Sequence, residues 1–489
     1  MQYFLFLFLF VTTLLSANET LKPVGEIKAS SFNYDIVAKQ YILKELDDSG
    51  TSGPFELIGE NKFIFVTRCG KIHFAKMNDD EVSFIHTGLL PNVDDIFCAD
   101  LRAKKSLLNM LPNKLLFGVK GIKVDLKKKK LLLHSHSLNS KDCLVVKIFE
   151  YPLSEKHPFL GMPKLVYTSD SGFPVGAFAG YDPSNGCPNI TSLVPTQAGG
   201  GIALDHKNNF YFSIGDMGSY SAPQNIDSSY GKIFKYDGEQ VSIYASGSRN
   251  SQGLFFDSKS NALYETEHGP KGGDELNLIM KGDNLGWPYS TYGEDYTANG
   301  DSHFVRLPGE ERWAGHSFGK KPIFSYSPAI APTSVLIVND NSMFKDWRGD
   351  ALISTLKEKS IYRVSLDGGQ AVSSEKLINL NSRIRFMVQA EDGTIYAKSD
   401  SNIFYEIILD WKKLPQNINI ENTVSQCNKC HQYKIVNDGI PNIYGGGEEL
   451  FVTKLNIIAN SSISNKIMQG LVSSLTANEI IKLAEYYNK

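Results

Sequence analysis

The 489-residue chain has almost no net charge and, beyond its first residues, no long apolar run. Its 50 Lys and Arg nearly cancel its 53 Asp and Glu, which leaves a formal net charge of -3. Phosphate-backbone binding needs a basic excess, so this balance argues against a general nucleic-acid-binding protein. A chain that is 42% hydrophobic and 21% charged can bury a large core, which excludes global disorder. At roughly 150 residues per domain, the length allows several domains or one large all-β domain with a small appendage.

The apolar run at the start of the chain covers residues 3–15 and is only 13 residues long. A helix that spans a bilayer needs about 20. Small residues follow the run, so we predict a secretory signal peptide over residues 1–17, cut near Ala17. No Lys or Arg precedes the run, and a retained membrane anchor is the alternative. We expect an exported, periplasmic protein with no transmembrane segment after cleavage of the signal.

Cysteine is scarce, with six in the whole chain. Four of them are scattered: Cys69, Cys98, Cys143 and Cys187. In an oxidising compartment some of these four would pair, but four cysteines allow three connectivities and the sequence does not choose among them. Buried unpaired thiols are the alternative.

The last two cysteines belong to the run Cys427-Asn428-Lys429-Cys430-His431, which is the pattern of c-type haem attachment. Two thiols spaced by two residues can add to the haem vinyl groups, and the adjacent histidine can reach the iron. A zinc half-site would need two more ligands, and no Cys or His follows His431. The pattern therefore predicts covalent haem c bound by Cys427 and Cys430, with His431 as an iron ligand.

Met468 is the only methionine after this motif, and methionine is a common second axial ligand of such an iron. A methionine that only fills a core is the alternative. Farther on, Thr476 and Glu479 have the spacing of a capping box, which predicts a closing helix. Residues 424–489 resemble the small all-α class I cytochromes c, although the proline that often neighbours the ligand methionine is absent.

Residues 18–412 lack any long helical pattern and repeat one unit instead, in which a short apolar strand, a polar turn and a second strand follow one another. Six such units occur, over residues 62–74, 121–134, 201–213, 253–265, 350–364 and 386–396. Repeated sheets of few strands predict an all-β, six-bladed β-propeller, with a β-sandwich as the less suitable alternative. Residues 413–423 would then link it to the cytochrome domain.

The most informative motifs lie in and after the fourth unit. Residues 247–254 read Gly-Ser-Arg-Asn-Ser-Gln-Gly-Leu, and residues 267–279 read Glu-His-Gly-Pro-Lys-Gly-Gly-Asp-Glu-Leu-Asn-Leu-Ile. Together with Leu356-Lys357 and Arg383-Ile384-Arg385, they closely resemble the soluble quinoprotein glucose/sorbosone (aldose sugar) dehydrogenases. Members of that family are six-bladed propellers that bind pyrroloquinoline quinone (PQQ) and calcium.

The resemblance implies a cofactor site whose chemistry suits these residue types. PQQ carries three carboxylates, which arginine forks and lysine ammonium groups bind well. The implied PQQ ligands are Arg249, Asn250, Gln252, Lys357, Arg383 and Arg385. Calcium, which prefers oxygen ligands, would take the backbone carbonyls of Gly269 and Pro270 and polarise the quinone. Asp274 and Glu275 would either form a second calcium site or anchor loops between blades.

One family residue is missing. The family pattern His, two residues, Gly-Arg-Leu supplies the base that takes the proton of the sugar hydroxyl. This chain has Gln197 at the position of the base and Gly201 at that of the arginine. An amide has no useful proton affinity, so Gln197 cannot be a general base. His206 lies in an expected hairpin turn, facing solvent, and His268 occupies a position where the family carries histidine without using it as base.

These observations support an exported quinohaemoprotein that oxidises a sugar, polyol or aldehyde. PQQ would pass the electrons to the tethered haem and then to a downstream redox protein, since tethering raises the local concentration of the acceptor. A propeller that has lost catalysis and serves as a binding or scaffold module beside an electron-transfer cytochrome is the second hypothesis. A cytochrome-linked enzyme with a different base is the third.

Overall fold

The computed structural model describes residues 20–409, apart from residues 32–33, 47–52, 79, 97–116, 142, 155–158, 171–196, 295–315, 317 and 343, and also Leu483. The predicted signal peptide, linker and haem motif, with Met468, lie outside the described residues. No described helix has the length and apolar character needed to cross a membrane.

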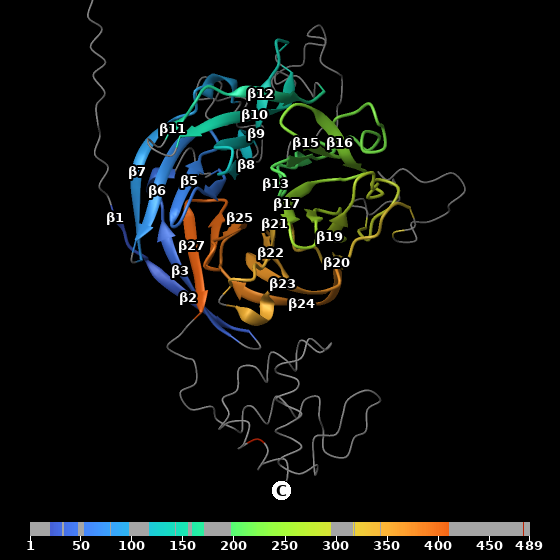
Figure 1. Cartoon of the computed structure of the whole chain (residues 1–489). Coiled ribbons are helices and arrows are strands. Elements are labelled where there is room, and N and C mark those ends of the chain that lie inside the picture. The colour runs from blue at the N-terminus through green and yellow to red at the C-terminus, as the bar shows by residue number, and fades with distance from the viewer. Residues whose placement is uncertain are drawn as a thin grey trace, which may run out of the picture.

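Six antiparallel sheets of four or five strands are arranged around a central axis (Figure 1). Their innermost strands, β4, β8, β13, β17, β21 and β25, contact one another in that order, and β25 contacts β4. Because the ring closes on itself, the six-bladed β-propeller predicted from the sequence is confirmed and a sandwich is excluded. Each of the six units recognised in the sequence lies in a different blade.

The strands of each blade run from the axis outward in nearly sequential order. Blade 1 contains β4 (Phe55–Leu57), β5 (Lys62–Val66), β6 (Lys71–Asn78), β7 (Glu81–Leu89) and β1 (Thr20–Leu21). Blade 2 contains β8 (Val119–Asp125), β9 (Lys130–Leu138), β10 (Leu144–Ser154), β11 (Phe159–Leu160) and β12 (Lys164–Thr168). Blade 3 contains β13 (Ile202–Leu204), β14 (Phe210–Ile214), β15 (Lys232–Tyr236) and β16 (Val241–Ser246).

The second half of the ring repeats this order. Blade 4 contains β17 (Ser251–Asp257), β18 (Ala262–Glu267), β19 (Asp274–Ile279) and β20 (Phe324–Tyr326). Blade 5 contains β21 (Pro332–Ile337), β22 (Ala351–Thr355), β23 (Ser360–Asp367) and β24 (Gln370–Asn379). Blade 6 contains β25 (Ile384–Gln389), β26 (Ile395–Ser399) and β27 (Ile403–Leu409), followed by β3 (Asp35–Ile42) and β2 (Gly25–Ser30).

Blade 6 joins the two ends of the propeller chain. Strand β3 pairs antiparallel with β27 from Ile36↔Leu409 to Ile42↔Ile403, so early and late strands share one sheet. In Figure 1 the blue strands β2 and β3 accordingly lie beside the orange β27. This pairing fixes the ring, because opening it would require the whole β3–β27 ladder to separate.

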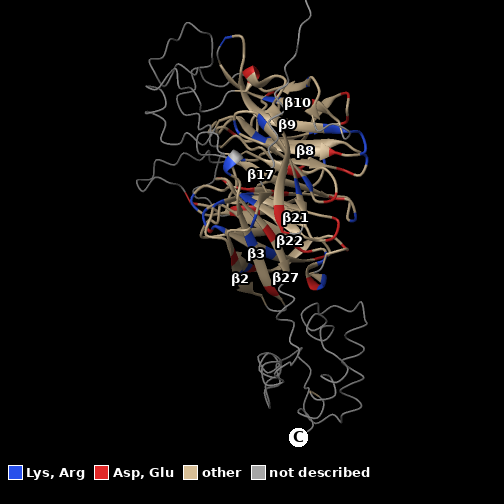
Figure 2. Ribbon diagram, turned by 90° about the vertical axis from the view of Figure 1, so that its left-hand side faces the viewer, with Lys and Arg blue, Asp and Glu red and all other residues tan. Residues whose placement is uncertain are grey.

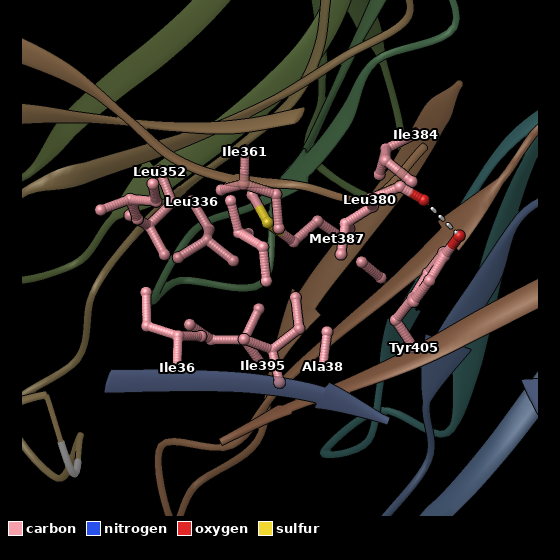
Figure 3. Packing of buried hydrophobic residues seen from close by; sticks show 14 of the residues in the cluster. Ile36, Ala38, Leu336, Leu352, Ile361, Leu380, Ile384, Met387, Ile395 and Tyr405 are labelled. Atoms are coloured by element: carbon pink, nitrogen blue, oxygen red, sulfur yellow. Dashed lines mark hydrogen bonds between the residues drawn. The ribbon is translucent and has the colours of Figure 1, made fainter. Parts of the chain in front are cut away.

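The core consists of apolar clusters between neighbouring blades. The cluster in Figure 3 combines Ile36 of β3 with Leu336 and Leu352 of blade 5 and Met387 of β25. At its edge the Tyr405 hydroxyl donates to the Leu380 carbonyl at 2.9 Å. Each buried Ile or Leu contributes roughly 1.5–3 kcal/mol, so the blades hold one another in place.

The polar residues of the hairpins fit the turns they form. Between β13 and β14, the Asp205 carboxylate accepts hydrogen bonds from the Lys207 and Asn209 backbone N–H groups, and Asn208 has a positive φ of 60°. Asparagine tolerates this conformation better than most residues do. His206 is exposed in the turn, as predicted. From the side, acidic and basic residues are interspersed over the propeller (Figure 2), in keeping with its small net charge.

Two of the four scattered cysteines, Cys69 and Cys143, are disulfide-bonded. The alternative of buried unpaired thiols is therefore wrong for these two. Cys98 and Cys187 lie outside the described residues.

Candidate functional site

A cavity of about 1250 Å³ opens at one end of the ring. In an antiparallel blade, the start of the innermost strand and the turn between the second and third strands lie at the same end. The residues that line the cavity come from these places in blades 3 to 6. They include every sequence-predicted quinone and calcium residue except Glu275, together with Gln197: Arg249, Asn250, Gln252, Gly269, Pro270, Asp274, Lys357, Arg383 and Arg385.

Arg249 is the buried cation of the cavity wall. Its Nη1 donates to the carbonyl oxygens of His268 at 2.8 Å and Gly269 at 2.7 Å. Its guanidinium carbon lies 5.3 Å from the centre of the Trp287 ring, a distance at which the cation is attracted to the ring. The Arg249 Nε is buried and has no hydrogen-bond partner among the described residues. The hydrogen bonds and the ring contact thus fix the Arg249 cation in the cavity lining.

Gln197, at the position of the missing base, connects Arg249 to a buried carboxylate. With its amide oriented to satisfy both groups, Nε2 donates to Asp216 Oδ1 at 2.6 Å and Oε1 accepts from Arg249 Nη2 at 2.9 Å. Burial raises the pKa of Asp216 to about 6, against the opposing effect of Arg249 and of hydrogen bonds from Gly218 and Trp287. The Asp216 carboxylate therefore lies next to the position of the base, although the base itself is absent.

Arg383 and Arg385 share the carboxylate of Asp400. The Arg383 Nε donates to Asp400 Oδ2 at 3.1 Å, and the Arg385 fork donates to both Asp400 oxygens. The remaining Arg385 Nη1 donates to Gln252 Oε1 at 3.0 Å. Burial alone would raise the pKa of Asp400, but Arg385, Arg68 and Arg383 lower it overall, so the group stays charged. One carboxylate thus positions two of the predicted quinone ligands.

The neutral predicted ligands form a chain of hydrogen bonds with the Gly199 backbone. The Gln252 Nε2 donates to Asn250 Oδ1 at 2.8 Å and to the Gly199 carbonyl at 3.3 Å. The Gly199 N–H donates to Asn250 Oδ1 at 3.2 Å. Because these partners come from blades 3 and 4, the amides tie the Gln197 loop to the predicted cofactor wall.

Lys357 differs from the three arginines. Its ammonium group has no hydrogen bond or ion pair with any described residue, although the residue lines the cavity. The neighbouring Glu358 carboxylate is paired with Lys376, so the Lys357 ammonium remains available to an anionic ligand in the cavity.

The backbone at residues 269–274 is held by Asp274. Its carboxylate accepts hydrogen bonds from the N–H groups of Gly269 at 3.0 Å, Ile330 at 2.7 Å and Ala331 at 2.7 Å. Burial raises its pKa to about 6, and these hydrogen bonds oppose the rise. These three hydrogen bonds make the carboxylate a loop anchor, but Oδ1 accepts only one of them, so a second calcium site at Asp274 stays a prediction.

Glu275 lies outside the cavity lining. Its carboxylate accepts from Asn277 Nδ2 at 3.1 Å and lies 3.6 Å from His316 Nε2. Among the described residues, no group of three or more His, Cys, Asp or Glu could hold a metal ion. A calcium ion at Gly269 would share that carbonyl with Arg249, which the two lone pairs of a carbonyl oxygen permit.

Among the described residues that line the cavity, His268 is the only histidine, and its surroundings keep it neutral. Its Nε2 lies 2.7 Å from the Pro332 carbonyl, and its Nδ1 lies 3.4 Å from Asn250 Nδ2. Burial, together with the charges of Arg249, Arg385 and Arg383, lowers its pKa to about 3, and the Pro332 contact opposes the shift. So low a pKa makes His268 a poor proton acceptor near neutral pH.

Asp216 and Asp400 were not recognised in the sequence. Each follows a strand as a single carboxylate, Asp216 after β14 and Asp400 after β26, in a position that has no motif of its own. The signal in the sequence would have been a single carboxylate just after a blade strand. Such a carboxylate points to a site only when the arginines that it binds are known.

Comparisons with known proteins point in the same direction. Residues 188–404 match the family model described as Glucose / Sorbosone dehydrogenase. Aldose sugar dehydrogenase YliI of Escherichia coli (strain K12) is 27% identical over 220 residues, which cover 42% of this chain and 57% of that protein. Quinoprotein glucose dehydrogenase B of Acinetobacter calcoaceticus is 26% identical over 224 residues, covering 36% and 47%. The chain thus matches about half the length of these relatives.

Solved structures support the fold. The apo-form of the soluble aldose sugar dehydrogenase from Escherichia coli matches with a TM-score of 0.57 at 19% identity, covering 76% of this chain and 98% of that chain. A glucose dehydrogenase structure matches with a TM-score of 0.56 at 20% identity and the same coverage. The resemblance to the glucose/sorbosone dehydrogenase family noted in the sequence is therefore supported by a family model and by curated relatives.

Proposed function

We propose that the protein is an exported quinohaemoprotein dehydrogenase. It oxidises a sugar, polyol or aldehyde through PQQ held in the cavity, and passes the electrons to the haem c of its own C-terminal domain and then to a downstream redox protein. The observation that carries the proposal is that Arg249, Lys357, Arg383 and Arg385, separated by up to 136 residues in the sequence, line one cavity. The family match to residues 188–404 supports the same cofactor chemistry.

The residues present suit a planar tricarboxylate. Lys357 forms no ion pair with a described residue, and Arg383 and Arg385 share the single carboxylate of Asp400. Pockets for small molecules are commonly about 300–1,000 Å³. A cavity of about 1250 Å³ has room for a cofactor of this size and a sugar beside it.

The chain's own residues would bind and orient the cofactor. The Asp400 carboxylate fixes the forks of Arg383 and Arg385 in the cavity lining, and Arg249 lies in the same lining beside Trp287. The carbonyls of Gly269 and Pro270 provide oxygen ligands for calcium. PQQ, when bound, supplies an electrophilic quinone that accepts two electrons from the substrate.

The enzyme and the catalytically inactive propeller differ in whether a residue takes the proton from the substrate. Gln197 cannot accept a proton, and its amide is already used by Asp216 and Arg249. This observation favours the second candidate, a propeller that binds a quinone or sugar without oxidising it. The cations kept around the cavity favour the enzyme over a propeller that binds only a neutral sugar, since such a sugar has no charge for them to bind.

Export is supported by two independent features. The predicted signal peptide covers residues 1–17. Cys69 and Cys143 are disulfide-bonded, and such bonds persist mainly in oxidising compartments.

The function is tested on the purified full chain with its haem. PQQ and calcium are added, and the absorption band of reduced haem is followed while aldoses, polyols and aldehydes are offered in turn. We expect haem reduction that depends on both the quinone and a substrate. Bound quinone without haem reduction by any substrate would contradict the enzyme and support the scaffold.

Lys357→Met is expected to weaken PQQ binding at least tenfold, because hydrogen bonds to charged groups contribute about 1.5–3 kcal/mol. The measurement is a calorimetric titration of PQQ in the presence of calcium. Lys359→Met, in the same turn but outside the cavity lining, is the matched control and should bind PQQ normally. Equal affinities of the two variants would show that Lys357 does not bind the cofactor.

A further inference from the structure

One aromatic side chain of the cavity is not used by the predicted cofactor site. Tyr292 lines the cavity together with Pro270 and Lys271, and 41% of the residue is exposed. Apart from the imidazole of His268, it is the only aromatic side chain that the structure describes in this lining. It was not predicted from the sequence as a PQQ or calcium ligand.

The backbone next to Tyr292 is joined to the loop that carries the predicted calcium carbonyls. The Lys271 N–H donates to the Glu294 carbonyl at 3.0 Å, and the Glu294 N–H donates to the Lys271 carbonyl at 2.9 Å. Gly293 has no side chain to separate the two segments, since a Cβ there would lie 2.7 Å from Pro270 Cγ. Tyr292 is therefore held beside the part of the cavity where calcium would polarise the quinone.

The ring of Tyr292 is supported by His316. The two ring centroids lie 5.4 Å apart, and the ring planes are inclined by 33°. His316 is itself only 4% exposed, so it forms a buried support. Because Tyr292 lines the cavity and remains two-fifths exposed, the part of its ring that His316 does not cover is available to a ligand.

The polar groups near the ring suit a neutral ligand that is rich in hydroxyls. Lys271 and Glu294 both line the cavity and form an ion pair, with Nζ 3.4 Å from Oε2. Their two charges cancel, so the pair offers no net charge to a cofactor carboxylate. A hydroxyl can still donate to the glutamate and accept from the lysine, whose side chains are 78% and 64% exposed. The Tyr292 hydroxyl, which has no hydrogen bond to a described residue, adds a donor and an acceptor.

We propose that Tyr292 is a specificity-determining residue, which selects the ring form of a sugar over open-chain polyols and short aldehydes. The C–H face of the sugar lies on the tyrosine ring, and its hydroxyls contact Lys271 and Glu294. An aromatic wall with a few polar groups is the usual lining of a small-molecule site. This proposal rests on the proposed function, because the ligand that Tyr292 selects is the substrate of the same cavity.

A sugar ring and an open chain of the same composition differ in what they present to a flat aromatic surface. A pyranose holds several C–H groups on one face in a fixed arrangement, so little ordering is needed before it contacts Tyr292. An open-chain polyol must first lose the freedom of several bonds, and that cost lowers its affinity. A short aldehyde buries too little apolar area to gain much from the contact.

The test is a set of calorimetric titrations of the full chain without added PQQ, so that no substrate is oxidised. Glucose, galactose and xylose are each compared with their own open-chain polyols, sorbitol, galactitol and xylitol. We expect at least one of the sugars to bind tenfold or more tightly than its polyol. If no sugar binds better than its polyol, the proposal is overturned.

Three variants locate the contact. Tyr292→Ser should abolish the preference for the ring form, and Tyr292→Phe, which keeps the aromatic surface, should retain most of it. Phe159→Ser is the control, because Phe159 of β11 is 51% exposed but does not line the cavity, and it should change nothing. A preference that survives Tyr292→Ser in a variant with normal thermal unfolding would refute the role of this residue.

A kinetic experiment with PQQ and calcium separates this proposal from the proposed function. Tyr292→Ser should raise the KM of haem reduction for the best sugar about tenfold and leave the KM for propanal within twofold. A chain that binds no quinone, but whose preference for the ring form depends on Tyr292, would contradict the proposed function while supporting this role. A chain that oxidises sugars with the same KM in Tyr292→Ser would support the function and overturn the role.

Discussion

Gln197→His is expected to raise the rate of substrate-dependent haem reduction by about 10²–10⁴-fold in protein loaded with PQQ and calcium, the usual contribution of a well-placed general base. The position already has what an imidazole needs. Asp216 Oδ1 lies 2.6 Å from the Gln197 amide nitrogen, so a ring N–H could donate to it while the other nitrogen faces the cavity. A buried carboxylate in this place fixes the tautomer and stabilises the imidazolium.

The control for this variant is Gln197→His combined with Asp216→Asn. An amide would hold the imidazole in the wrong tautomer, so most of the gain should be lost. Initial rates of haem reduction with the best substrate measure both variants, and thermal unfolding checks that each is folded. If Gln197→His binds quinone normally but gains no activity, the chain uses another base or no longer performs catalysis.

Replacing both Cys427 and Cys430 by Ala is expected to remove all haem that survives denaturation of the protein. Each thiol would form one thioether to a haem vinyl group, and without either no covalent bond to the porphyrin remains. The measurement is haem staining of the denatured protein after electrophoresis, with each single variant expected to keep one attachment. Denaturation-resistant haem in the double variant would reject the attachment site.

Met468→Leu is the matched variant for the same domain. It should leave haem covalently attached but lower the reduction potential of the iron, because an axial methionine raises that potential. A potential that does not change would show that Met468 fills a core and is not a ligand.

Much of the propeller could be predicted from local pattern. Each unit, such as residues 253–265, pairs an apolar strand with a polar turn and a second strand, and these became β17 and β18. Closure of the ring could not be predicted in this way. The pairing of β3 with β27 joins residues more than 350 positions apart, and no local signal says which strands will share a sheet.

The residues of the cavity could likewise be predicted only in part. Arg249 and Lys357 are predicted by the sequence because they belong to motifs, and both line the one cavity. Asp216 and Asp400 are not predicted by the sequence, because a single charged residue near the end of a strand is indistinguishable from one that faces solvent. Only the three-dimensional arrangement shows that the Asp400 carboxylate accepts hydrogen bonds from both Arg383 and Arg385.

The account depends on one physical claim, that cations from several blades form a site for a small tricarboxylate. Calorimetric titration of PQQ with calcium into the full chain tests it most directly, alongside a variant carrying Arg383→Gln and Arg385→Gln. The account predicts one equivalent of quinone bound by the natural chain, with an affinity that falls steeply as salt is added, and binding at least a hundredfold weaker in the variant, about the loss expected for two charged contacts. A natural chain that binds no quinone, or a variant that binds it equally well, would contradict the claim.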